Sequence, residues 1–235
     1  MIEGFSLAWV AAAALAFVTA VFLVANAWRR PGLAGLSWAG SLIVAALVSF
    51  LLQPEADSFT VIIRILVTVM VIVWGMLTVS RVLAAAGRQK ADRSGRTLAV
   101  YARDYLAQTA LAVVVAAPVL LINLSAYDLA AAPAVAATVI GFAIWLIGLA
   151  MEMAAQGRLP GFVPAGAARR GKQIFGGLLG RLGQRPEALG LSIEWWGLFV
   201  MGLGLPMGWL GIVSPLILML LGLALHEAKP ARKAA

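Results

Sequence analysis

Long apolar runs constrain this chain more than any other feature. A bilayer core about 30 Å thick is crossed by roughly 20 apolar residues as an α-helix, whose backbone groups bond within the segment. Such runs recur along the sequence at residues 5–28, 36–52, 59–86, 105–123, 130–153, 191–205 and 209–225. The sequence therefore predicts an all-α integral membrane protein, with about seven transmembrane helices in a single polytopic domain of residues 1–235.

The last two runs are short, and only Pro206, Met207 and Gly208 separate them. One long broken helix and a tight helical hairpin both fit this pattern. The hairpin is favoured because the two runs together are longer than a single span needs.

The polar residues limit the kinds of site that the chain can build. Charged residues make up 12% of the sequence, against about 25% in a soluble domain. The absence of cysteine excludes disulfides, thiolate metal sites and a cysteine nucleophile. The one histidine, His226, and ten carboxylates offer few metal ligands, so no metal site and no histidine-rich di-iron centre is expected.

The basic residues alternate with the apolar runs. They follow the first, third and fifth runs and fill the tail, whereas Glu55, Asp57 and Asp128 occupy the opposite loops. Because basic loops stay in the cytoplasm, this alternation predicts an amino terminus outside and a carboxyl terminus in the cytoplasm. The net charge of +8 then indicates contact with anionic lipids rather than nucleic acid.

One basic segment has its own apolar pattern. Between residues 169 and 185, apolar side chains recur at helical spacing beside several arginines and a lysine. This pattern is typical of a helix that lies in the headgroup layer. An irregular loop remains the alternative, because each glycine weakens a helix by up to about 1 kcal/mol, and the segment contains Gly176, Gly177, Gly180 and Gly183.

Several polar and aromatic residues fall inside or beside the apolar runs. Arg64 is expected to extend its long side chain toward the outer surface. Glu152 and Glu194 are predicted at the same depth near the inner boundary, where they could bind a cation, relay protons or pair with arginines of the basic loops. Ion pairing is the favoured interpretation. Trp195 and Trp196 match an interfacial aromatic belt.

Short motifs along residues 60–220 resemble one family of membrane enzymes. Pro186, Gly190 and Trp195-Trp196-Gly197 align without a gap on the signature S-R-H-P-N-Y-F-G-E followed by W-W-G. Other matches occur in the family's order, namely Trp74-Gly75, Gln108 with Pro118, Gly148 with Glu152, Trp209, and Ser214-Pro215-Leu216. The chain thus resembles bacterial membrane proteins similar to steroid 5-alpha-reductases, in the wider group that includes isoprenylcysteine carboxyl methyltransferases. This resemblance implies insertion in a bacterial inner membrane.

The same alignment shows which polar residues of the family are missing. Gln184, Arg185, Glu187, Ala188 and Leu191 stand where the signature has arginine, histidine, asparagine, tyrosine and glutamate. Outside the signature, three further polar positions differ, at Leu77, Gln156 and Arg158. The lost groups are hydrogen-bond donors and acceptors, and each buried loss costs about 1–3 kcal/mol. The signature therefore keeps the packing residues of the family's site but lacks the polar residues that would bind a ligand.

The resemblance also implies where such a site would lie. It places a pocket at the cytoplasmic ends of the last four helices, and its remaining polar residues would be Glu152, Arg181, Arg185 and Glu187. NADPH is the cofactor that this pocket would bind in an active enzyme, and it would supply the hydride. No catalytic residue is assigned.

Three hypotheses of function follow from the resemblance. The first is a non-catalytic family member that serves as an accessory, assembly or structural subunit of a membrane complex, with other membrane proteins as partners. The second is an NADPH-dependent reductase of a steroid-like or lipid-like unsaturated substrate. The third is a lipid-binding or methyltransferase-like protein that uses the same cavity. The first is favoured, because a family scaffold does not by itself imply the family's activity.

Overall fold

The computed structural model describes residues 4–27, 34–52, 55–86, 98–125, 132–155 and 186–227. Within these ranges the regular structure is helical, and no strand is present. The elements are α1 (Gly4–Ala27), α2 (Ala34–Leu51), α3 (Ser58–Ala86), α4 (Leu98–Val115), α5 (Ala117–Leu124), α6 (Ala132–Ala155), α8 (Pro186–Gly202), the 3-10 helix η2 (Gly208–Ile212) and α9 (Val213–Glu227).

Each predicted apolar run is helical, so the all-α class is confirmed. Three helices are long and apolar enough to cross a membrane, within Ala8–Ala25, Ser58–Ala85 and Pro133–Ala154, and the bent pair α4–α5 would be a fourth. The remaining apolar helices, Gly35–Leu51, Ala188–Gly202 and Gly208–Leu221, are shorter. These helices identify an integral membrane protein. The predicted interfacial helix at 169–185 lies outside the described residues.

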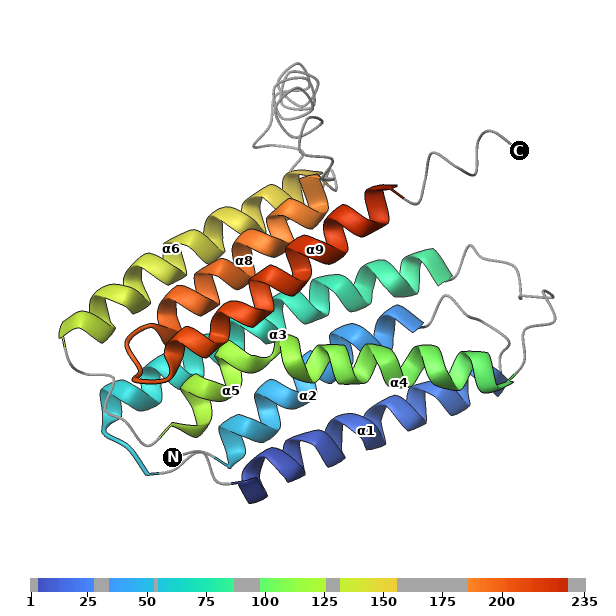
Figure 1. The fold of residues 1–235 in the computed structure, drawn as a ribbon, viewed down its shortest axis with the longest axis horizontal. Coiled ribbons are helices and arrows are strands. Elements are labelled where there is room, and N and C mark those ends of the chain that lie inside the picture. The colour runs from blue at the N-terminus through green and yellow to red at the C-terminus, as the bar shows by residue number, and fades with distance from the viewer. Residues whose placement is uncertain are drawn as a thin grey trace, which may run out of the picture.

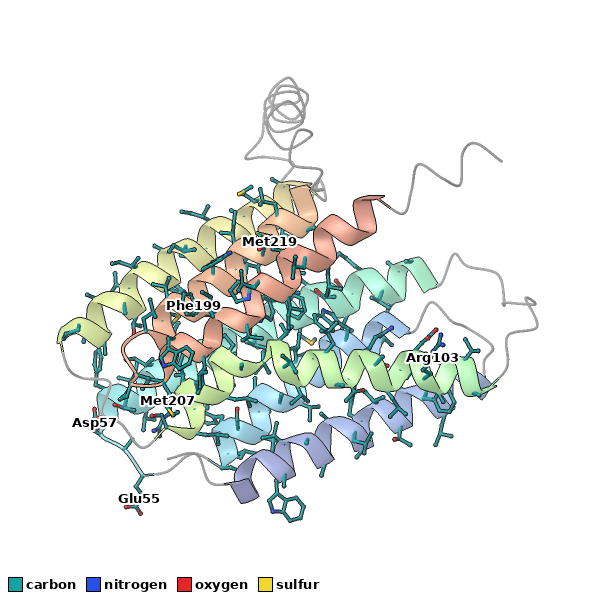
Figure 2. The ribbon with its side chains drawn as sticks, in the orientation of Figure 1. Glu55, Asp57, Arg103, Phe199, Met207 and Met219 are labelled. Carbon is teal, nitrogen blue, oxygen red and sulfur yellow. The ribbon has the colours of Figure 1, made fainter. Side chains whose placement is uncertain are left out.

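Successive helices run in alternate directions through the bundle (Figure 1). The ends of α1, α3, α6 and α9 lie at the same end as the starts of α2, α4 and α8, and we call this the basic end. Arg103 lies at the basic end, while Glu55 and Asp57 lie at the opposite end (Figure 2). The charge alternation in the sequence therefore corresponds to the two ends of the folded bundle.

The fourth predicted run is a broken helix rather than a straight one. α4 and α5 meet at Ala116 with a bend of 51°. Pro118 has no N–H to donate to the carbonyl of Val114, so the bend follows from the sequence. Ser214 donates its hydroxyl to that carbonyl at 3.4 Å, and the Trp195 indole N–H donates to the Val115 carbonyl at 2.8 Å. Neighbouring helices thus satisfy backbone groups at the break, as an apolar environment requires.

The end of the chain forms the predicted hairpin. α8 ends at Gly202, a tight turn follows, and η2 leads directly into α9, which packs against α8. The turn is tight because Gly202 and Gly208 approach each other through their backbones, where a side chain on Gly208 would collide with Gly202. The alternative of one long broken helix is therefore wrong.

α6 and α8 form the most extensively packed helix pair of the described structure. Their glycines face each other in antiparallel register, Gly141 against Gly197 and Gly148 against Gly190. A Cβ atom on Gly148 would lie 2.6 Å from the backbone nitrogen of Glu194. Small residues that let two backbones touch are a usual means of helix association in membranes. This contact fixes the depth of Glu152 relative to Glu194.

Buried polar groups tie the other helices together. The Asn123 amide, on α5, donates toward the Ala46 carbonyl and the hydroxyls of Ser49 and Thr68 at 3.0–3.3 Å. Arg64 on α3 is fully buried, and its guanidinium donates to the Ser125 carbonyl at 2.5 Å. The prediction that Arg64 extends to the outer surface is therefore wrong, because the end of α5 offers it a carbonyl inside the bundle.

Candidate functional site

An ion pair lies near the basic end, between α3 and α6. The Arg81 guanidinium is 2.5 Å from Oε1 of Glu152, whose side chain is 6% exposed. Arg81 also donates to the Thr78 hydroxyl at 2.6 Å and to the Leu77 carbonyl at 3.3 Å, both on its own helix. These bonds hold the guanidinium in place against the carboxylate. Charged residues in membrane segments usually face the bundle interior and pair in this way.

A second carboxyl completes this cluster. Glu194, on α8, is fully buried, and it lies beside Glu152 across the backbone contact of Gly148 and Gly190. Apart from that neighbouring carboxyl, neither oxygen of Glu194 has a hydrogen-bond partner among the described residues. Arg81, Glu152 and Glu194 thus form one buried cluster with two acids and a single base. We call it the Arg81–Glu152–Glu194 cluster.

Two tryptophans adjoin the cluster. Trp74 lies about two turns before Arg81 on α3, and Trp195 directly follows Glu194 on α8. Their rings meet edge to face with centroids 4.9 Å apart, and both side chains are buried. Trp195 therefore packs in the core and donates a hydrogen bond to the backbone at the α4–α5 bend, so its assignment to an interfacial belt is wrong. Trp196 is half-buried and packs edge to face on Phe199.

The structure describes one of the four predicted site residues in full. Glu152 lies in the Arg81–Glu152–Glu194 cluster. Arg181 and Arg185 fall outside the described residues, and Glu187 is placed only as part of the backbone of α8. The described part of the chain therefore does not test whether these four side chains meet.

Sequence reasoning missed Arg81, although it predicted correctly that Glu152 pairs with an arginine. The expected partners were arginines of the basic loops, whereas Arg81 lies within α3. The signal was available, because an arginine inside a long apolar helix needs a buried partner. Arg81 also lies one helical turn beyond Leu77, where the resembling family has its arginine, and residues four apart share a helix face.

The described residues around Glu152 are closely packed. The Glu152 carboxylate is buried and paired with Arg81. Beside it, the backbones of Gly148 and Gly190 are so close that a Cβ atom on Gly190 would lie 2.8 Å from the Glu152 nitrogen. Among the described residues, no group of three or more histidine or acidic side chains could hold a metal. The described side chains of the cluster therefore contact one another inside the bundle.

Comparisons with known proteins give a family. Neither a curated protein nor a solved structure matches the chain. A family model described as a protein of unknown function, DUF1295, matches residues 21–234, which include every helix from α2 to α9. The chain therefore belongs to the DUF1295 family of proteins of unknown function.

Proposed function

We propose that this protein is a non-catalytic relative of steroid 5-alpha-reductase-like membrane proteins that serves as an accessory, assembly or structural subunit of a membrane complex. One observation carries the proposal. Five of the described residues that create the resemblance are used for packing inside the bundle, and the polar residues of the signature have been replaced; the five are Trp74, Gly148, Gly190, Trp195 and Ser214.

The contacts of these residues support the proposal one by one. Gly148 and Gly190 form the backbone contact between α6 and α8. Trp74 and Trp195 pack on each other, and Trp195 also donates a hydrogen bond to the Val115 carbonyl at the bend. Ser214 donates to the carbonyl that Pro118 leaves free. A scaffold held together in this way stays folded without a cofactor, and it offers a stable apolar surface to other membrane proteins.

Cofactor binding to the natural sequence tests this proposal. We expect no saturable NADPH binding at micromolar concentration in purified protein, measured by the fluorescence of the nicotinamide ring. A dissociation constant above that range corresponds to less than about 8 kcal/mol of binding free energy. The lost asparagine, tyrosine and glutamate contacts of the signature, at about 1–3 kcal/mol each, account for such a loss.

The control is the same protein with the signature restored at four positions, Arg185→His, Glu187→Asn, Ala188→Tyr and Leu191→Glu. NADPH binding by this variant, and not by the natural protein, would support the view that the natural site has lost its cofactor-binding residues. Tight NADPH binding by the unmodified protein would instead favour an NADPH-dependent reductase of a steroid-like or lipid-like substrate.

We further propose that all seven helical passes cross a bacterial inner membrane, with the basic end in the cytoplasm and against anionic lipid. The alternation of helix direction in Figure 1 and the basic residues beside one end of the bundle support this topology. The shorter helices would then span a locally thinned bilayer or be shielded by neighbouring helices.

Reporter fusions test the topology. We expect alkaline phosphatase to be active when inserted at Asp57 and inactive when fused after Ala235, with a cytoplasmic fluorescent reporter giving the opposite pattern. The basic stretches flanking α1, α3, α6 and α9 provide the physical reason. If both reporters lay on the same side, the number of spans between Asp57 and Ala235 would be even, which would contradict the proposed topology.

A further inference from the structure

The Arg81–Glu152–Glu194 cluster contains more acidic groups than basic groups, and packing does not explain this excess of acid. Two carboxyl groups adjoin one guanidinium, and all described bonds of that guanidinium go to Glu152 and to its own helix. Glu194 is fully buried beside Glu152, and apart from that neighbouring carboxyl neither of its oxygens has a hydrogen-bond partner among the described residues. An ionised carboxylate so placed would have neither a donor nor a counter-ion of its own.

The ionisable groups around Glu194 come from few elements. α6 supplies Glu152 and α3 supplies Arg81, while α5 and η2, which also pack against α8, contain no ionisable residue. α9 contains only His226 and Glu227, at its far end, and their side chains lie outside the described set. The described surroundings therefore supply a single positive charge for two acids.

Two neighbouring carboxyl groups can avoid carrying two negative charges by sharing one proton. If one carries a proton, its O–H donates to the other, and the repulsion between two negative charges in a low-dielectric site disappears. The pair then has one negative charge, which the guanidinium of Arg81 balances. The bound ligand would be a proton, because the described residues offer too few oxygen ligands for a metal ion.

We propose that Glu152 and Glu194 share one exchangeable proton, so that the Arg81–Glu152–Glu194 cluster is an electroneutral proton-binding site inside the membrane domain. Glu152 is the acceptor that Arg81 stabilises, and Glu194 is the proton carrier. The cluster lies near the basic end, where α3 and α6 end and α8 begins, so a proton can be exchanged with the solution at that end. This site does not depend on whether the protein binds NADPH.

Infrared spectroscopy of the purified protein in lipid tests the proposal at neutral pH. We expect the C=O stretching band of a protonated carboxyl, which shifts to lower frequency in D2O. Glu194→Gln should remove the band, since glutamine keeps the shape of the side chain but cannot carry this proton. Asp104→Asn is the matched control, because Asp104 is a half-buried acid at the same end that pairs with Arg103, and it should leave the band unchanged.

A second variant changes the band in the opposite direction. Arg81→Gln removes the positive charge, so both carboxyls should be protonated, and the band should grow to about twice its intensity. A purely structural role for the cluster predicts no such gain. The absence of a protonated-carboxyl band from the natural protein, or its persistence in Glu194→Gln, would overturn the proposal.

Discussion

Gly148→Ala should separate α6 from α8 and destabilise the protein by about 3 kcal/mol, at the upper end of the range for overpacking a core. The added methyl group would lie 2.6 Å from the Glu194 nitrogen and 2.7 Å from the Gly190 carbonyl oxygen. Both obstacles are backbone atoms, so no side chain can rotate to make room. The free energy of unfolding can be measured by reversible unfolding in mixed detergent–SDS micelles.

Gly202→Ala is the matched control for this experiment. Gly202 ends α8, and the nearest atom to an added Cβ would be the Gly208 carbonyl oxygen at an ordinary 3.9 Å. Its effect on stability should stay within about 0.5 kcal/mol, as for most substitutions that meet no obstacle. Equal effects of the two substitutions would show that helix propensity, rather than the α6–α8 contact, decides the stability.

Removal of both acids from the Arg81–Glu152–Glu194 cluster should have the second large effect. The variant Glu152→Gln/Glu194→Gln leaves Arg81 inside the bundle without a counter-ion. Breaking a buried ion pair in this way costs about 3–5 kcal/mol. Arg81 retains 29% side-chain exposure, so we expect about 3 kcal/mol. The same unfolding measurement reports this loss.

Two companion variants separate charge from packing. Glu194→Gln alone should cost less than about 1 kcal/mol, because it leaves the Arg81–Glu152 pair intact. Addition of Arg81→Gln to the double variant should recover most of the lost stability, since no uncompensated charge then remains. A triple variant as unstable as the double variant would show that the side-chain shapes in the cluster, and not the charges, contribute the lost stability.

The sequence by itself determined the membrane class, the positions of the helices and the alternation of charge. These features depend on local composition and on the length of apolar runs, which the bilayer thickness sets for any chain. The hairpin at 191–225 also followed from length alone, whereas the break near Pro118 was not predicted, although a proline inside an apolar run indicates one. The spacing of Glu152 and Glu194 from the ends of their runs placed them at one depth.

Only the tertiary structure decided which groups meet. Arg81 and Glu152 are 71 positions apart in sequence, and only the tertiary fold brings the Arg81 side chain of α3 to the Glu152 carboxylate of α6. Trp195 resembled an interfacial residue, but the bend at Pro118 exposed a carbonyl that its indole binds. Arg64 is buried because α5 ends beside it. A side chain's partner depends on helices distant in sequence, so local pattern predicts depth in the membrane but not the contact that satisfies a buried polar group.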